Sequence, residues 1–239
     1  MAVPDMRLTV DHATVQRGAW SLFADGTFSD GIHLVSGAVG SGKSTLALVM
    51  AGLLPATSGT VKRDGIKSMM LSMQFPEFHI TGLSVAEECA SWGLDFGTII
   101  RSAQLEISGS VSPLSLSRGE LKRLHLACIL ARNDDLLLLD EPFSSLDCGE
   151  KERLCSQLNA RSQGITVIFT HEQSAFPRVD QIWEIQNGEL FNAGKMPEAL
   201  VRWQHAPALI KKLRDVGKCP ANLTPDAIRE AACRTHGSG

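Results

Sequence analysis

Residues 37 to 45 have the composition and spacing of a loop that binds nucleotide phosphates. The segment reads Gly-Ala-Val-Gly-Ser-Gly-Lys-Ser-Thr, between an apolar run at 32–35 and a helix-forming stretch at 46–54. Its glycines let the backbone curl so that successive N–H groups point at a phosphate. The lysine adds charge toward the β and γ oxygens, and the hydroxyl after it can ligate Mg²⁺. We therefore predict that the chain binds a nucleoside triphosphate through Gly37, Gly40, Ser41, Gly42, Lys43, Ser44 and Thr45.

Two carboxylates follow a wholly apolar stretch further along the chain. Residues 136–139 are four leucines, which predict a buried strand, and Asp140 and Glu141 come directly after them. Ligands of open α/β sheets lie at the carboxyl ends of the strands, so we expect both side chains beside the phosphate loop. We predict that Asp140 and Ser44 hold Mg²⁺ and that Glu141 polarises an attacking water. The alternative is a buried strand followed by an acidic helix cap.

Composition restricts the class of protein. The 239 residues carry a net charge of −3 and the pI is about 6.2, so nothing marks a nucleic-acid surface. The longest apolar runs are far shorter than the ~20 residues that span a bilayer, and we see no signal peptide in the first residues. The cysteines are scattered without a CxxC pair, so we expect reduced thiols in a cytosolic protein and no metal centre made of cysteine.

Strand and helix patterns alternate along the chain and predict an α/β fold. The expected strands lie at 6–10, 20–24, 32–35, 68–73, 136–139 and 165–169, with turns at 25–26 and 30–31. The expected helices lie at 46–54, from 84 onward, at 95–107, 116–131 and 149–161, and in the tail from 197. Such alternation is typical of a mostly parallel sheet that is covered by helices.

Four further segments indicate the kind of nucleotide-binding protein. Residues 116–120, Leu-Ser-Arg-Gly-Glu, open a helix, and residues 144–147, Ser-Ser-Leu-Asp, follow the two carboxylates. Thr170-His171-Glu172 and Gln74 each follow a predicted strand. In this order, and along most of the chain, the segments resemble the nucleotide-binding subunit of ABC transporters. The resemblance implies one ABC-type P-loop domain over 1–239, with a mostly parallel sheet, an N-terminal antiparallel β subdomain, an inserted helical subdomain at about 75–133 and a helical tail at about 196–239.

The same resemblance implies ATP as the nucleotide and assigns roles in hydrolysis. Ser117 and Gly119 start a helix whose N-terminus is an anion site, but they cannot reach their own phosphate loop across the inserted subdomain. Two such chains must therefore sandwich two ATP molecules. His171 contacts the γ-phosphate, Gln74 links the Mg²⁺ and water site to the helical subdomain, and Asp147 organises the dimer seam.

A narrower resemblance concerns the ATPases of energy-coupling-factor (ECF) importers of vitamins and metal ions. It rests on residues 74–77, Gln-Phe-Pro-Glu, on 84–88 after them, and on the tail, in which 207–213, Gly217 and 223–225 precede a last helix. It implies a peripheral subunit at the cytoplasmic face of the membrane. Its partners would be a second ABC ATPase, identical or paralogous, and integral membrane transport subunits. The alternatives are a non-transport ABC ATPase acting on nucleic acid or ribosomes, whose coiled-coil insertions and basic arms we do not find, and a non-hydrolysing regulatory module.

Two positions depart from the family pattern. Arg118 stands where the family usually has glycine, so it either points away or pairs with phosphate in a working site, or it impairs one half-site of a heterodimer. The chain has no tyrosine, and the region 14–18, where the family commonly places an aromatic residue against adenine, has no aromatic side chain. Trp20 is nearest, and it either stacks on the base or packs in the core.

Overall fold

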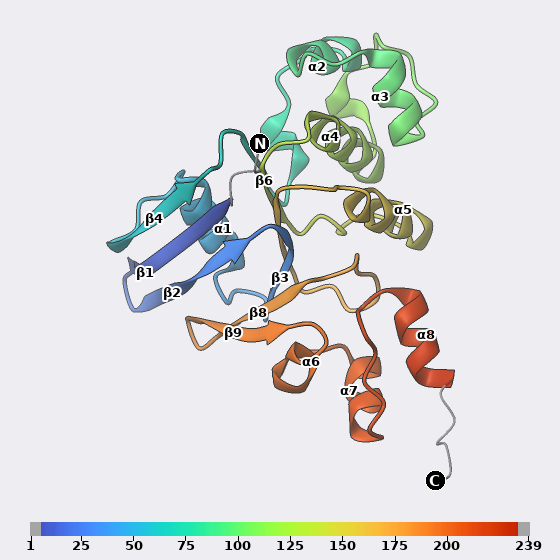
Figure 1. The fold of residues 1–239 in the computed structure, drawn as a ribbon. Coiled ribbons are helices and arrows are strands. Elements are labelled where there is room, and N and C mark those ends of the chain that lie inside the picture. The colour runs from blue at the N-terminus through green and yellow to red at the C-terminus, as the bar shows by residue number, and fades with distance from the viewer. Residues whose placement is uncertain (1–5, 234–239) are drawn as a thin grey trace, which may run out of the picture.

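A computed structural model of the chain describes residues 6 to 233, in which nine strands form one sheet (Figure 1). The order across the sheet is β4-β1-β2-β9-β8-β3-β7-β6-β5. The strands are β1 (Arg7–Arg17), β2 (Trp20–Ser29), β3 (Gly31–Gly37), β4 (Ser58–Asp64), β5 (Met69–Ser72), β6 (Leu136–Asp140), β7 (Ile165–Thr170), β8 (Gln181–Gln186) and β9 (Glu189–Lys195). The helices are α1 (Lys43–Ala51), α2 (Val85–Ser91), α3 (Phe96–Ala103), α4 (Arg118–Arg132), α5 (Cys148–Asn159), α6 (Ala199–Arg202), α7 (Ala208–Asp215) and α8 (Pro225–Cys233), with 3₁₀ turns at Pro76–His79 and Pro113–Ser115.

The centre of the sheet is parallel, as predicted. Strands β8, β3, β7, β6 and β5 all run in one direction, whereas β1 pairs antiparallel with β2 and β4. Strands β6 and β7 are buried along their whole lengths, because a parallel strand is covered on both faces and tolerates an unbroken apolar sequence. Asp140 of β6 lies opposite Phe169 of β7, and Ser36 of β3 lies opposite Thr170. The register therefore brings the carboxyl ends of β3, β6 and β7 to one edge.

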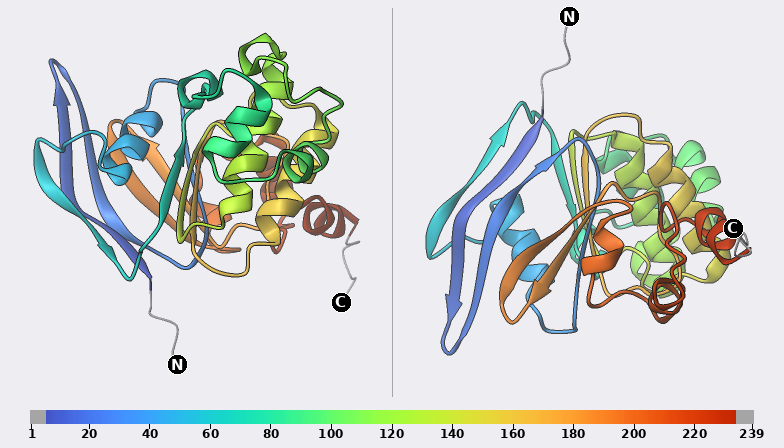
Figure 2. Two further views of the ribbon diagram at one scale, coloured as in Figure 1. Left: turned by 90° about the horizontal axis from the view of Figure 1, so that it is seen from above. Right: turned by 60° about the horizontal axis from the view of Figure 1, so that its bottom comes forward.

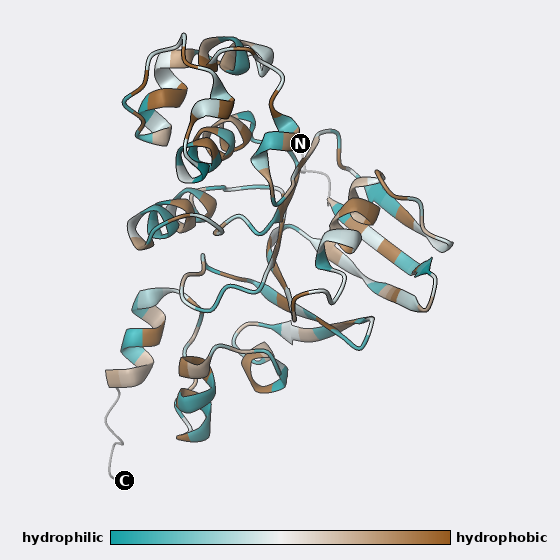
Figure 3. Ribbon diagram, turned by 180° about the vertical axis from the view of Figure 1, so that it is seen from behind, coloured by the Kyte–Doolittle hydropathy of each residue, from teal (hydrophilic) through white to brown (hydrophobic). Residues whose placement is uncertain are grey.

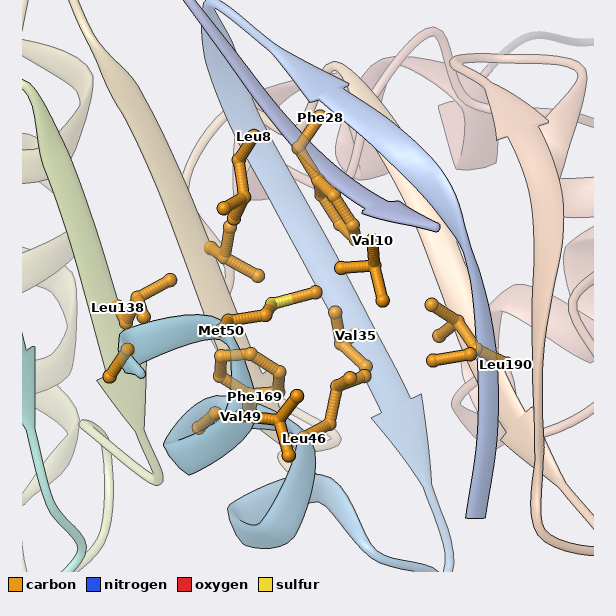
Figure 4. Close-up of a cluster of buried hydrophobic side chains, with 14 of the residues drawn as sticks. Leu8, Val10, Phe28, Val35, Leu46, Val49, Met50, Leu138, Phe169 and Leu190 are labelled. Atoms are coloured by element: carbon orange, nitrogen blue, oxygen red, sulfur yellow. The ribbon is translucent and has the colours of Figure 1, made fainter. Parts of the chain in front are cut away.

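Helix α1 and the N-terminal strands lie on one side of the central strands, and α4, α5 and the tail helices lie on the other (Figure 2). On one side, Leu46, Val49 and Met50 of α1 pack against the central strands and against β1 and β2 (Figure 4). On the other side, α4, α5 and the tail bury a second cluster that includes Leu137 and Phe143. Hydrophobic residues accordingly follow the central strands when the ribbon is coloured by hydropathy (Figure 3). Hydrophobic side chains thus cover both faces of the central strands, and polar side chains are placed at the strand ends.

Helix α4 joins the helical part of the chain to the sheet. Leu126 and Ile129 belong to the cluster against the sheet, whereas Leu124 and Cys128 pack with α2 and α3 in a third, separate cluster. Ser117 caps α4 in a full capping box with Glu120. One helix thus connects the hydrophobic cluster against the sheet with the outlying helices α2 and α3 (Figure 1).

The C-terminal tail is held to the sheet by specific polar contacts. The indole N–H of Trp203, a fully buried side chain, donates to the Ser36 hydroxyl at 2.6 Å. The carboxylate of Glu184 on β8 is also fully buried and accepts from the backbone N–H groups of Gln204 and His205. These contacts fasten the tail to β3 and β8 immediately before the phosphate loop.

Several predicted elements are wrong in detail. The turn expected at Asp25-Gly26 lies inside β2, and the chain turns instead at Gly18. Glycine is required at position 26 because a Cβ there would lie 2.6 Å from the ring of Trp183. The residue therefore allows close packing within the strand and does not form a turn. The helix expected over 95–107 ends at Ala103, since Gln104 is left-handed at φ 50°. Strands β4, β8 and β9 had no predicted counterpart.

Candidate nucleotide-binding site

The loop between β3 and α1 is folded around the ammonium of Lys43. This group is buried and donates to the carbonyl oxygens of Gly37 at 2.9 Å and Ala38 at 3.0 Å. Gly42, at φ 109°, precedes the helix, and a Cβ there would lie 2.9 Å from the ring of Trp20. Burial lowers the pKa of Lys43, although Glu141 nearby opposes the shift. The contacts of Lys43 thus give the loop a defined conformation, and the N–H groups at the start of α1 are available to bind a phosphate.

A cavity of about 450 Å³ lies over this loop. Its lining includes most of the predicted site residues and two side chains from the N-terminal strands: Arg17, Trp20, Val39, Gly40, Gly42, Lys43, Ser44, Thr45, Gln74, Glu141 and His171. The structure thus brings together residues from five separate segments at the carboxyl edge of the sheet. Ser41 lies in the same loop, and its buried hydroxyl has no hydrogen-bond partner among the described residues. A phosphate oxygen would satisfy this hydroxyl.

Asp140 and Ser44 fit a divalent cation. The Asp140 side chain is buried near the Ser44 hydroxyl, and its Oδ1 has no hydrogen-bond partner within residues 6 to 233. Burial raises the pKa of Asp140, although the Ser44 hydroxyl and Lys43 oppose this. Oxygen ligands from one carboxylate and one hydroxyl are those that Mg²⁺ takes beside substrate phosphates. Gln74 is exposed and lines the same cavity.

Glu141 is held on both of its carboxylate oxygens. Its Oε1 lies 2.7 Å from Nδ1 of His171, and its Oε2 accepts a hydrogen bond of 2.9 Å from the hydroxyl of Thr170. Glu141 is buried and has a left-handed backbone at φ 48°, a conformation that a non-glycine residue adopts only when its surroundings fix it. The turn after β6 therefore directs this carboxylate into the cavity, where it can accept a proton from a water molecule.

Gly37, Ser41 and Asp140 border the cavity without lining it, whereas three predicted site residues lie in other segments, at the starts of α4 and α5. Ser117 donates hydrogen bonds from its hydroxyl and its backbone N–H to the Glu120 carboxylate, at 2.7 and 2.9 Å. Gly119 lies in the first turn of α4, next to the backbone of Ser145. Asp147 caps α5 and accepts a 2.8 Å bond from the Glu150 amide. None of the three lines the cavity over the chain's own loop.

Arg118 lines a separate hollow of about 190 Å³ together with Gln74, Glu77, Ser144 and others. Its side chain is exposed at the start of α4.

Two further residues of the site escaped sequence reasoning. Arg17 ends β1 and lines the cavity next to Trp20, but an arginine at a strand end carries no sequence signal. Lys122 of α4 is 1% exposed, and its ammonium donates to the carbonyl oxygen of Gln74 at 3.3 Å. Burial lowers the pKa of Lys122 to about 8, against the attraction of Asp140 and Glu141. Its place among the leucines of an amphipathic helix was the available signal, since a lysine there must be paired or functional.

A strand–glycine loop–helix unit beside an acidic strand end defines the P-loop class of nucleotide-binding proteins. Residues 27–144 match the family model described as ABC transporter. An uncharacterized ABC transporter ATP-binding protein of Mycobacterium tuberculosis is 34% identical, over 82% of this chain and 31% of that protein, so the chain spans about a third of that relative's length. An energy-coupling factor transporter ATP-binding protein of Thermotoga maritima is 33% identical, over 72% of this chain and 74% of that protein.

Solved structures share the fold. A bacterial Atm1-family ABC exporter with ATP bound matches with a TM-score of 0.68 and 21% identity, over 90% of this chain and 43% of that one. A dimeric ATP-binding cassette bound to ADP and Pi matches with a TM-score of 0.60 and 21% identity, over 77% of this chain and 96% of that one. The chain belongs to the ABC transporter family of ATP-binding proteins, and its domain has the fold of an ABC ATPase cassette. The predicted family and fold class are thereby confirmed. None of the helices in residues 6 to 233 is both long and apolar enough to cross a bilayer.

Proposed function

We propose that this chain is the ATP-hydrolysing subunit of an ECF-type membrane importer of a vitamin or metal ion. The observation that carries the proposal is the single cavity in which Lys43, Glu141 and His171 meet beside Asp140. The ECF name of the Thermotoga maritima relative supports the subfamily, as does the Gln-Phe-Pro-Glu segment at 74–77. The chain would act at the cytoplasmic face of the membrane as a peripheral subunit.

In the proposed reaction, ATP binds with its phosphates on the N–H groups of the loop and of α1. Lys43 leaves the carbonyls of Gly37 and Ala38 for the β and γ oxygens. Ser44, Asp140 and Gln74 would hold Mg²⁺, which neutralises charge on the phosphate oxygens when bound. Glu141 takes a proton from water as the water attacks the γ-phosphorus in line with the leaving oxygen.

His171 contributes to the same step after it parts from Glu141. Its imidazole then contacts the γ-phosphate and stabilises the charge that spreads over the transferred group. Positioning and electrostatics thus supply most of the catalysis, as is general for phosphoryl transfer.

A second ABC ATPase would complete each site. Ser117 and Gly119 start α4 away from their own cavity, and the N-terminus of this helix is suited to the γ-phosphate held by the partner. Asp147 would lie at the seam between the two chains. The dimeric cassette among the structural relatives supports this arrangement. The tail from about 196 would help to join the two ATPases.

An apolar surface next to Gln74 suits an integral membrane subunit. Phe78 is 71% exposed and Leu83 is 85% exposed, and Phe75 beside Gln74 is also exposed. Exposed large apolar side chains that gather in one segment mark an interaction site. Closure of the dimer would move the helical subdomain, about 75–133, and pass that motion to the membrane subunit through the Gln74 segment.

The hydrolytic part of the proposal is tested with Glu141→Gln. This variant keeps the shape of the side chain but removes the base, so it should bind ATP, form a stable ATP-bound dimer and lose at least about a hundredfold in kcat. Phosphate release and size-exclusion chromatography with ATP measure both properties. A variant that hydrolyses ATP as fast as the wild type would remove Glu141 from this role.

The transport part is tested by co-purification of tagged chain from its native membranes in mild detergent. A transmembrane scaffold with a small membrane-embedded binding protein, and a second ATPase, would support the ECF type. Recovery of two large permease subunits would support a role in transport but contradict the ECF subfamily. Recovery with ribosomes or DNA would instead favour a non-transport ABC ATPase.

A further inference from the structure

The hydroxyl of Thr170 is the buried anchor of the Glu141 carboxylate. Thr170 ends β7, and 1% of its surface is exposed. Its Oγ1 donates to Glu141 Oε2 at 2.9 Å and accepts from the backbone N–H of Glu172 at 2.9 Å. Since the Glu172 amide occupies an acceptor position of the hydroxyl, the hydroxyl proton is directed at the carboxylate.

The two side chains that hold Glu141 differ in their freedom to move. The His171 side chain is 56% exposed, so it can turn toward a phosphate in the cavity. Thr170 is fixed within the sheet by the pairing of β7 with β3 and β6 and cannot follow. When His171 leaves, Oε1 becomes free for water, whereas Oε2 keeps the Thr170 hydroxyl.

We propose that Thr170 is a positioning residue for ATP hydrolysis, which selects Oε1 of Glu141 as the oxygen that takes the proton from water. The inference rests on the proposed role of Glu141 as the base. The backbone N–H of His171 also donates to Oε2, at 3.4 Å, so the Thr170 hydroxyl is the shorter of the two contacts on this oxygen. The amide of Glu141 is itself bound to Phe169, so backbone and side chain are both anchored to β7.

The test compares Thr170→Val with Thr170→Ser. Valine keeps the volume and branching but removes the hydroxyl, whereas serine keeps the hydroxyl. We expect Thr170→Val to lower kcat about ten- to a hundredfold, the value of one hydrogen bond to a charged group. The KM for ATP should change by less than about twofold, because the lost contact acts in the chemical step. Serine should restore most of kcat.

Thr166→Val is the matched control. Thr166 is equally buried on the same strand, about 13 Å from Thr170 along β7, and lies outside the nucleotide cavity. This variant should hydrolyse ATP like the wild type. If Thr170→Val does not fold, Thr170→Ala takes its place against the same serine variant.

Two results would overturn the inference: a valine variant with wild-type kcat, or a serine variant as slow as the valine variant. Glu141→Gln is measured in parallel to separate this inference from the proposed function. If Glu141→Gln is inactive and Thr170→Val is not impaired, only the positioning role has failed. If Glu141→Gln is as active as the wild type, the role of Glu141 has failed, and that of Thr170 with it.

Discussion

Nδ1 of His171 lies 2.7 Å from Oε1 of Glu141, so the two residues assigned to the γ-phosphate and to the water hold one another across the ends of β7 and β6. Under the proposed mechanism, neither residue could act in hydrolysis while this pair persists. Binding of ATP would then have to offer the imidazole a better partner than the carboxylate. The pair would thereby link occupation of the cavity to release of the proposed base.

Loss of the imidazole should impair hydrolysis more than binding. We expect His171→Ala to lower kcat about a hundredfold, because a stabilising contact to the transferred phosphoryl group is lost, with ATP affinity changed by less than about threefold. Phosphate release and equilibrium nucleotide binding measure the two quantities. His12→Ala, which removes an exposed imidazole on β1, is the control. Equal loss of kcat in both variants would contradict a specific role.

The base of the nucleotide should lie against Trp20. Its ring lines the cavity beside Arg17, and stacking of a base on an aromatic side chain is worth about tenfold or more in affinity. Trp20→Ala should weaken ATP binding by this amount and Trp20→Phe by less. Arg17→Ala tests whether the guanidinium shares the contact. Unchanged affinity in Trp20→Ala would assign that ring to packing against Gly42 and the hydrophobic core.

Arg118 should not disable the N-terminus of α4 as an anion site. Its side chain is exposed at the rim of a hollow and leaves the α4 cap intact, so we expect Arg118→Gly to change the ATPase rate less than about tenfold. Steady-state ATPase assays of both proteins at equal concentration measure this. A gain of several hundredfold would mean that the native half-site is degenerate and that the chain functions with a stronger partner.

Stability should depend on pH through Lys122. Burial lowers the pKa of Lys122 in the folded chain from 10.5 to about 8, so between these values the unfolded chain binds more protons and the free energy of unfolding rises with pH. Relative to Lys122→Met, the wild type should gain about 1 to 2 kcal/mol between pH 7.5 and 9.5. Urea unfolding of both proteins at the two pH values measures the difference. Parallel pH dependences would contradict the assigned ionisation.

Contiguous motifs made much of the site predictable. The phosphate loop, Asp140-Glu141 and His171 are each fixed by a few neighbouring residues at the end of a strand, and strand ends of a parallel sheet meet at one edge. Arg17 reaches the site through tertiary packing that no local spacing encodes, and Lys122 was marked only by its place in an amphipathic helix. Thr170 was visible beside His171, but its bond to Glu141 depends on the register of β6 with β7.

The missed strands have a related explanation. Strand β4 reads Ser-Gly-Thr-Val-Lys-Arg-Asp and lies at the sheet edge, where one exposed side permits polar residues. Strand β8 contains Glu184, a residue type that is normally exposed. Here it is fully buried, and backbone N–H groups of the distant tail donate hydrogen bonds to its carboxylate. Such compensation is available only after the chain has folded.

The bond from Trp203 to Ser36 sets a limit on how far the protein can be shortened. A version ending after β9 would lack the indole beneath the strand that carries the phosphate loop and would expose the apolar surface on which Ala206, Ile210 and Leu223 pack. Partners of the buried Glu184 would be removed by the same cut. We therefore expect a stable ATP-binding unit to need the tail at least through residue 223, well beyond the last strand of the sheet.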